Sequence, residues 1–168
     1  MVSGKVWHAL WVSPQYVYKP LFASHIFVLH PPCAATPMTA TIDILRDLVG
    51  FATVSRDPNR ALIDYVADRL AATDADVRII PDEDGGKANL FATTGPRDRG
   101  GVMLSGHTDV VPVDGQDWTM PPFSCTEADG RLYGRGTADM KGFVAAALNA
   151  FEVSAGTELA TPLHLALS

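Results

Sequence analysis

The chain has 168 residues, of which 47% are hydrophobic and 19% are charged, and its formal net charge is -6 at pH 7. This length is sufficient for one domain with a hydrophobic core. Nucleic acids and anionic membranes repel an acidic chain, so we expect neither as a partner. Cys33 and Cys125 lie far apart and form no CxxC pair. Cysteine usage therefore argues against a disulfide framework and favours a reducing, cytoplasmic location.

Residues 1–38 differ in composition from the rest of the chain. They contain no Asp or Glu, and several prolines interrupt every apolar run. The longest apolar segment, from Leu21 to Leu29, is far too short to span a bilayer, which needs about 20 residues. We interpret residues 1–38 as a disordered leader, or as sequence upstream of a misassigned start with Met38 as the functional beginning. The small residues at Cys33-Ala34-Ala35 weakly favour a signal peptide as the alternative.

Two amphipathic helices are predicted after Met38. Thr39 or Thr41 can cap the first, and Asp57-Pro58-Asn59 forms a break before the second. Apolar residues recur at helical spacing in both segments. The expected inner face of the first helix is Ile42, Leu45, Leu48, Val49 and Ala52, and that of the second is Ala61, Leu62, Tyr65, Val66 and Leu70.

Short apolar runs and turn residues predict strands in the remainder of the chain. A hairpin is expected from residues 77–80 and 88–93, followed by a strand at 102–104, a second hairpin within 124–133, a helix from Met140 to about Val153, and a final strand at 163–167. The strands are apolar enough to be buried on both faces of a sheet. The alternation of helices and strands predicts an α/β layered domain with a mixed sheet.

Two polar clusters follow apolar or glycine-rich runs and are the candidate functional residues. Ligand sites in α/β sheets lie beyond the carboxyl ends of strands, where His107 is expected. Asp109 lies two residues after His107, so its carboxylate can orient the imidazole and leave the other ring nitrogen free for a metal ion. Asp139 follows a glycine-rich run that permits a tight turn. Imidazole and carboxylate together suit zinc or a related divalent ion.

Each residue also has a structural interpretation. His107 can be a hydrogen-bonded residue at a strand end, and Asp139 can be the N-cap of the following helix. Arg135 and Lys141 can be solvated charges. Loop anchors are the alternative role for Trp118 and Phe123, and packing in a strand is the alternative for Cys125. Spacing alone leaves these alternatives open.

The combined motifs are more specific than either cluster. The strings SGHTDVVP, DGQDW and DGRLYGRGTADMKG follow one another between Val102 and Gly142. They resemble the acetylornithine deacetylase/succinyl-diaminopimelate desuccinylase family of metallohydrolases, which also includes aminoacylases and carboxypeptidases. The resemblance extends from about Met38 to Ser168. It implies a three-layer α/β/α zinc-peptidase-like catalytic domain with a mixed sheet, C-terminally truncated, in which residues 39–168 form the N-terminal part.

The resemblance implies a role for each candidate residue. His107 would bind one metal ion, Asp139 would bridge two, and Asp109 would act as a catalytic residue that orients His107. The peptide bond between Asp139 and Met140 is expected to be cis. Two divalent ions, zinc or cobalt, would polarise an amide carbonyl while a glutamate general base activates water. The substrate would be a small N-acyl amino acid, and N-acetyl-L-ornithine, an intermediate of arginine biosynthesis, is the expected one.

The C-terminus departs from the family pattern. In family members the strand ending in LALS precedes two adjacent acidic residues, a general base and a ligand, whereas this chain stops at Ser168. We therefore expect the complete enzyme to be a homodimer through a domain absent here, and the 168-residue chain to be inactive alone. Another activity of the same family is the alternative function, and a non-catalytic binding or regulatory protein is the alternative of a different class. A serine or cysteine hydrolase is disfavoured because neither GxSxG nor a Cys beside a His occurs.

Overall fold

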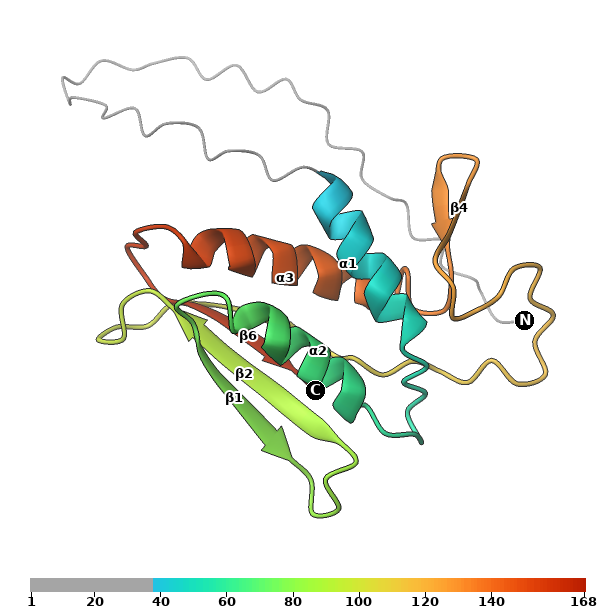
Figure 1. The fold of residues 1–168 in the computed structure, drawn as a ribbon, viewed down its shortest axis with the longest axis horizontal. Helices are drawn as coiled ribbons and strands as arrows, with labels where there is room; N and C mark the ends of the chain where they lie inside the picture. Colours follow the sequence, from blue (N-terminus) through green and yellow to red (C-terminus); the bar gives the residue numbers. More distant parts are fainter. Residues whose placement is uncertain (1–37) are drawn as a thin grey trace, which may run out of the picture. The chain divides into compact units, whose positions relative to one another are not determined.

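The computed structural model describes residues 38–168. The expected leader, apart from Met38, therefore lies outside the described residues. Along the chain, the elements are α1 (Met38–Gly50), α2 (Arg60–Leu70), β1 (Asp76–Pro81), β2 (Ala88–Thr94), β3 (Val102–Gly106), β4 (Thr126–Ala128), β5 (Arg131–Tyr133), α3 (Lys141–Ala155) and β6 (Leu163–Leu167) (Figure 1). Within residues 38–168, no helix combines the length and the apolar character that a membrane span requires.

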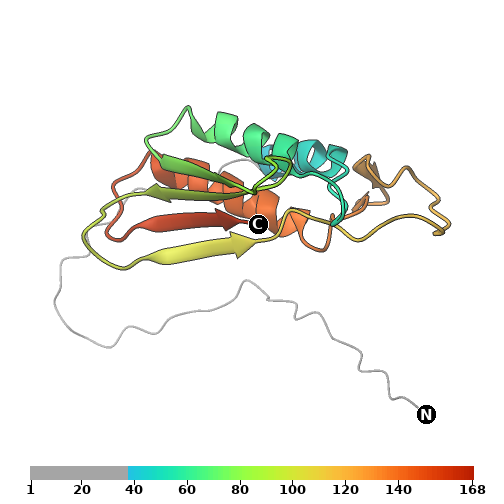
Figure 2. The ribbon, with the colours of Figure 1, turned by 90° about the horizontal axis from the view of Figure 1, so that it is seen from below.

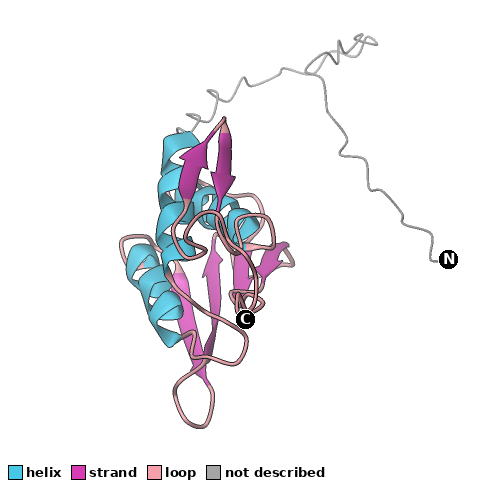
Figure 3. Cartoon of the chain, turned by 90° about the vertical axis from the view of Figure 1, so that its right-hand side faces the viewer, coloured by secondary structure: helices cyan, strands magenta, loops and turns pink. Residues whose placement is uncertain are grey.

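Four strands form one mixed sheet in the order β1-β2-β6-β3. β2 is antiparallel to β1 and to β6, whereas β3 and β6 are parallel neighbours with Val102 opposite Leu163 and Gly106 opposite Leu167. The β4–β5 hairpin forms a separate pair of strands (Figure 3). The predicted α/β class, the mixed sheet and both hairpins are confirmed.

All three helices cover the same face of the four-stranded sheet (Figure 2). Leu90 and Ala92 of β2 and Leu165 and Leu167 of β6 point to that face and are buried in the core. The other face of the sheet is only partly covered: Arg78, Asn89, Met103 and Ser105 are exposed, whereas Phe91, Thr93, His164 and Ala166 of the central strands are half-buried. The prediction of strands buried on both faces is therefore wrong for residues 38–168, which form one helical layer and the sheet of the expected three layers.

The helix predictions need two corrections. α1 begins at Met38, so Thr39 and Thr41 lie inside the helix and do not cap it; the hydroxyl oxygen of Thr41 instead accepts a hydrogen bond from Asn149 of α3 at 2.8 Å. The buried stripes are rotated relative to those expected, since Ile44 and Ile63 are buried, whereas Ala52 and Ala61 are exposed. Periodicity identifies an apolar stripe, but the packing partners, α3 for α1 and the strands β1 and β2 for α2, decide which residues along its edges are covered.

Candidate metal centre

The segment 107–110 leaves the carboxyl end of β3 and is held on both sides. The backbone N–H and the hydroxyl of Thr108 donate to the carbonyl of Ser168, at 2.6 and 2.9 Å, directly after β6. On the other side, the hydroxyl of Thr53, in the loop after α1, donates to the carbonyl of Thr108 at 2.7 Å. Thr108 is fully buried. The residue next to His107 is therefore fixed between the end of β6 and the loop after α1.

Asn59 is a buried residue behind this segment that the sequence indicated only as part of a break. Its side-chain amide donates to the hydroxyl of Thr108 and to the carbonyl of Ala88, both at 3.0 Å. Its carbonyl oxygen accepts the N–H of Ala88 at 2.9 Å. One side chain thus joins the start of α2, the start of β2 and the segment that follows β3.

Asp139 lies in a loop between Gly136 and α3. The N–H of Lys141 donates to the carbonyl of Gly136 at 2.8 Å and closes this loop. The peptide bond between Asp139 and Met140 is cis, as expected. Met140 occupies the N-cap position of α3, and no side chain makes a capping hydrogen bond there. The alternative interpretation of Asp139 as the helix N-cap is therefore wrong.

α3 brings Asp139 to the end of β3 by packing across Gly106. A Cβ at Gly106 would lie 3.2 Å from both Met140 and Val144, so only glycine permits this close approach without displacement. The N–H of His107 also donates to the sulfur of Met140 at 3.4 Å. These contacts set the strand end and the loop beside one another.

The three predicted site residues come together in the structure. Nε2 of His107 lies 3.3 Å from Oδ1 of Asp139, which comes from a different element. Nδ1 of His107 lies 3.0 Å from Oδ1 of Asp109 and 3.0 Å from the Asp109 carbonyl oxygen. The imidazole therefore contacts one carboxylate through each ring nitrogen. The Asp139 side chain is 89% exposed, so its position depends on the backbone of its loop.

The donor chemistry of this cluster fits a divalent metal ion in part. A ring nitrogen and a carboxylate oxygen that face each other are ligands typical of zinc. Within residues 38–168, however, no group of three or more His, Cys, Asp or Glu side chains is placed to hold a metal ion. His107 and Asp139 thus fit two positions of a ligand set, and Asp109 fits the role of a hydrogen-bond partner behind His107.

Lys141 is not the solvated charge that the sequence permitted. Its side chain is 1% exposed, and its ammonium donates to the carbonyls of Leu48 and Phe51 at 2.9 and 2.6 Å, at the C-terminal end of α1. Burial lowers the pKa of Lys141 from 10.5 to about 8. The two carbonyls favour the charged form, because the last carbonyls of a helix lack intrahelical donors.

Arg135 is likewise not a free charge. Its guanidinium lies 4.9 Å from the centroid of the Trp118 ring and donates to the side-chain oxygen of Gln116 at 2.6 Å. The indole N–H of Trp118 donates to the same oxygen at 3.1 Å. Trp118 is therefore a loop anchor, as the structural interpretation proposed. The thiol of Cys125 is partly buried against the core, and burial raises its pKa.

Comparison with known proteins agrees with this geometry. Residues 103–167 match the family model described as Peptidase family M20/M25/M40. The chain is 40% identical over 131 residues to an acetylornithine deacetylase of Proteus mirabilis (strain HI4320), covering 74% of this chain and 34% of the relative. It is 44% identical over 108 residues to an acetylornithine deacetylase of Pasteurella multocida (strain Pm70), covering 64% and 28%. The chain thus spans about one third of the length of these curated relatives.

Solved structures give the same fold. Human carnosine dipeptidase 1 matches with a TM-score of 0.66 and 28% identity, over 76% of this chain and 31% of the dipeptidase. An M20 family metallo-carboxypeptidase, Sso-CP2 from Sulfolobus solfataricus, matches with a TM-score of 0.66 and 22% identity, over 76% and 30%, and supports the fold alone. Because sequence motifs, site geometry and fold agree with the family match, residues 103–167 of this chain belong to peptidase family M20/M25/M40.

Proposed function

We propose that this chain is part of a metal-dependent amidohydrolase that removes the acetyl group from N-acetyl-L-ornithine, a reaction of arginine biosynthesis. The observation that carries the proposal is the facing pair of His107 and Asp139, 3.3 Å apart, within a chain 40–44% identical to curated acetylornithine deacetylases. The compartment would be the cytoplasm. The complete protein would bind two divalent ions, zinc or cobalt, act on a small N-acyl amino acid and form a homodimer.

The chain's own residues support a division of roles. His107 would bind a metal ion through Nε2, because Nδ1 is occupied by Asp109. The Asp139 carboxylate would bind beside it and offset part of the positive charge. A divalent ion held there would supply the charge that polarises the amide carbonyl of the substrate. We propose further that residues 39–168 form the N-terminal part of the catalytic domain and lack turnover alone, because two ligands hold a metal ion weakly.

Zinc binding tests the site directly. We expect zinc titration of the 168-residue chain to shift the side-chain nitrogen resonances of His107 in NMR spectra. Comparison with the His107→Ala variant assigns those resonances and gives the zinc binding due to the other histidines, which is subtracted. Asp139→Asn should weaken zinc binding. An unchanged zinc affinity in both variants would contradict the metal site.

The substrate is tested in a chimera, because the chain alone is proposed to be inactive. Residues 38–168 replace the matching third of the Proteus mirabilis relative. We expect the cobalt- or zinc-loaded chimera to hydrolyse N-acetyl-L-ornithine in preference to N-succinyl-diaminopimelate, and the same chimera with His107→Ala to fall to background. Turnover of N-acetyl-L-ornithine by the 168-residue chain, well above its own His107→Ala variant, would refute the proposed inactivity.

Peptide hydrolysis is the second candidate function. It is favoured by the 28% identity and the TM-score of 0.66 with human carnosine dipeptidase 1. A faster reaction of the chimera with a dipeptide than with N-acetyl-L-ornithine would assign the chain to this branch.

A further inference from the structure

We propose that Lys141 is a positioning residue for Asp139. Its buried ammonium holds the Asp139 loop against the backbone of residues 48–55. The same backbone segment hydrogen-bonds to the segment after β3 that carries His107. The inference rests on the proposed metal site of His107 and Asp139, and extends it to a residue that contacts neither.

The Asp139 side chain does not hold itself in place. It is 89% exposed, and its described partner is Nε2 of His107 at 3.3 Å. The position from which its carboxylate reaches His107 is therefore set by the backbone of the loop from Gly136 to Lys141. Any residue that fixes both ends of this loop fixes Asp139.

Lys141 is the last residue of the loop and contacts its first residue, Gly136. Its N–H donates to the carbonyl of Gly136 at 2.8 Å. Its aliphatic stem passes over Gly136, where an added Cβ would lie 3.1 Å from Cδ and 3.3 Å from Cγ of Lys141. Gly136 has φ of 90°, a conformation that side-chain-bearing residues rarely adopt. The loop is thus closed by the backbone of Lys141 and packed against its stem.

The ammonium then ties this closed loop to the end of α1. It donates to the carbonyls of Leu48 and Phe51 at 2.9 and 2.6 Å. Two residues further on, Thr53 donates to the carbonyl of Thr108 at 2.7 Å and accepts the N–H of Val110 at 2.9 Å through its own carbonyl. The end of α1 and the loop after it therefore hold both sides of the facing pair.

The buried environment of Lys141 makes its connection to the end of α1 specific. Lys141 is among the largest of the fully buried side chains described, and its ammonium donates to two carbonyls. A cation buried in this way has a defined geometry, because displacement would leave the ammonium without its hydrogen-bond acceptors. An apolar side chain of similar length would fill the space without specifying the same position.

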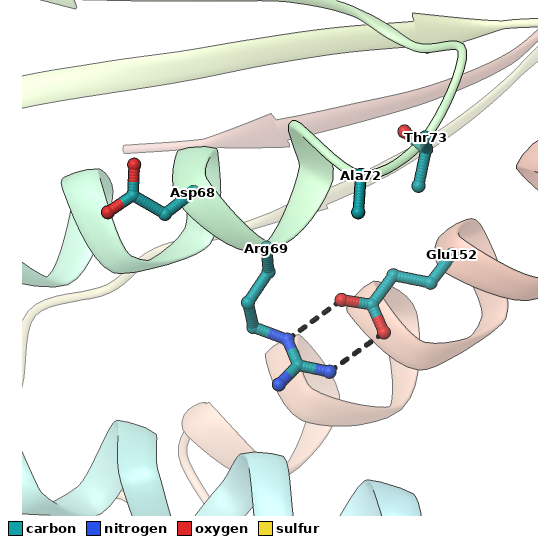
Figure 4. Close-up of a pocket in the computed structure, with 5 residues that line it drawn as sticks. All are labelled: Asp68, Arg69, Ala72, Thr73 and Glu152. Carbon is teal, nitrogen blue, oxygen red and sulfur yellow. Dashed lines mark hydrogen bonds and ion pairs between the residues drawn. The ribbon is translucent and has the colours of Figure 1, made fainter.

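The matched control lies at the other end of α3. Arg69 of α2 forms a two-point ion pair with Glu152 of α3, at 2.8 and 2.9 Å (Figure 4). Glu152 lies 11 residues after Lys141 in the same helix, which is about 16 Å at the usual rise per residue. Arg69→Met therefore removes a cation that joins two helices and lies away from His107 and Asp139.

Lys141→Met is compared with Arg69→Met in the full 168-residue chain. For Lys141→Met we expect the zinc dissociation constant, measured from the His107 resonances, to rise about tenfold and the visible spectrum of bound cobalt to change. We expect Arg69→Met to retain the wild-type affinity and spectrum. Equal weakening in both variants, or none in a folded Lys141→Met, overturns the proposal.

A metal-free measurement separates this proposal from the metal site. Amide hydrogen exchange should become faster at residues 136–141 in Lys141→Met and stay unchanged there in Arg69→Met. If zinc binding is unchanged in His107→Ala, the proposed metal site is wrong. The exchange rates in Lys141→Met then still show whether Lys141 holds the loop in place. Should Lys141→Met not fold, Lys141→Gln, which keeps a shorter uncharged donor, takes its place. Wild-type exchange and wild-type zinc affinity in folded Lys141→Gln refute the positioning role.

Discussion

Gly142 lies in the first turn of α3, where a change to alanine should have the opposite sign to that expected from helix propensity. Alanine at an interior helix position usually stabilises by about 1 kcal/mol relative to glycine. At Gly142, however, an added Cβ would overlap the carbonyl oxygen of Thr137. This oxygen belongs to the backbone of the Asp139 loop, so no side-chain rotation can relieve the overlap.

We expect Gly142→Ala to lower the free energy of unfolding by about 2 kcal/mol. Overpacking of this kind costs up to about 3 kcal/mol, from which the propensity gain of about 1 kcal/mol is subtracted. Urea denaturation of the 168-residue chain, followed by far-UV circular dichroism, measures the change. We also expect the amide resonances of residues 137–141 to move, because the loop must shift away from the new methyl group.

Gly156→Ala is the matched control at the C-terminal end of the same helix. Its Cβ would meet only the carbonyl oxygen of Val153, at 3.9 Å, and its φ of -92° is open to any residue. We expect this variant to be as stable as the wild type or up to about 1 kcal/mol more stable, because alanine restricts the unfolded chain. If Gly142→Ala is at least as stable as the wild type, the close approach of α3 to the Asp139 loop is wrong.

Three further variants test the packing of the helices and the sheet. Burial and a hydrogen bond to Asp47 raise the pKa of Tyr65 from 10.0 to about 12. The protonated phenol should therefore contribute fully to stability below pH 10 and lose this contribution as pH rises through 12. After allowance for solvent screening the contribution is about 1 kcal/mol, and Tyr65→Phe should flatten this part of the pH profile of the unfolding free energy. Asn59→Ala should cost about 3 kcal/mol in urea denaturation, because it leaves buried groups of Ala88 without partners, whereas exposed Asn89→Ala should change stability by less than about 0.5 kcal/mol. Phe151→Ala removes a fully buried ring of the core and should cost about 4 kcal/mol; a loss below about 1 kcal/mol would contradict its placement in the core.

The local pattern of the sequence was sufficient for most of the strands. Leu163–Leu167 is the predicted final strand with the same bounds, and the turn residues around Asp129 and Gly130 indicated the β4–β5 hairpin. These elements depend on alternation and turn chemistry, which are properties of neighbouring residues. The approach of His107 and Asp139 was implied by motif resemblance, because no local pattern relates residues 32 positions apart.

Local patterns and motif resemblance were sufficient to predict the α/β class, the approximate bounds of the helices and strands, and the residues that meet at the end of β3. Tertiary structure alone decided which edge of each helix is covered, and that Lys141 is buried and not solvated. A lysine after a polar turn has no local signal for burial, since the carbonyls of Leu48 and Phe51 that accept its hydrogen bonds lie about 90 positions away in the chain. Burial of a charge depends on partners brought by folding, and those partners are specified only when α1 and α3 pack together.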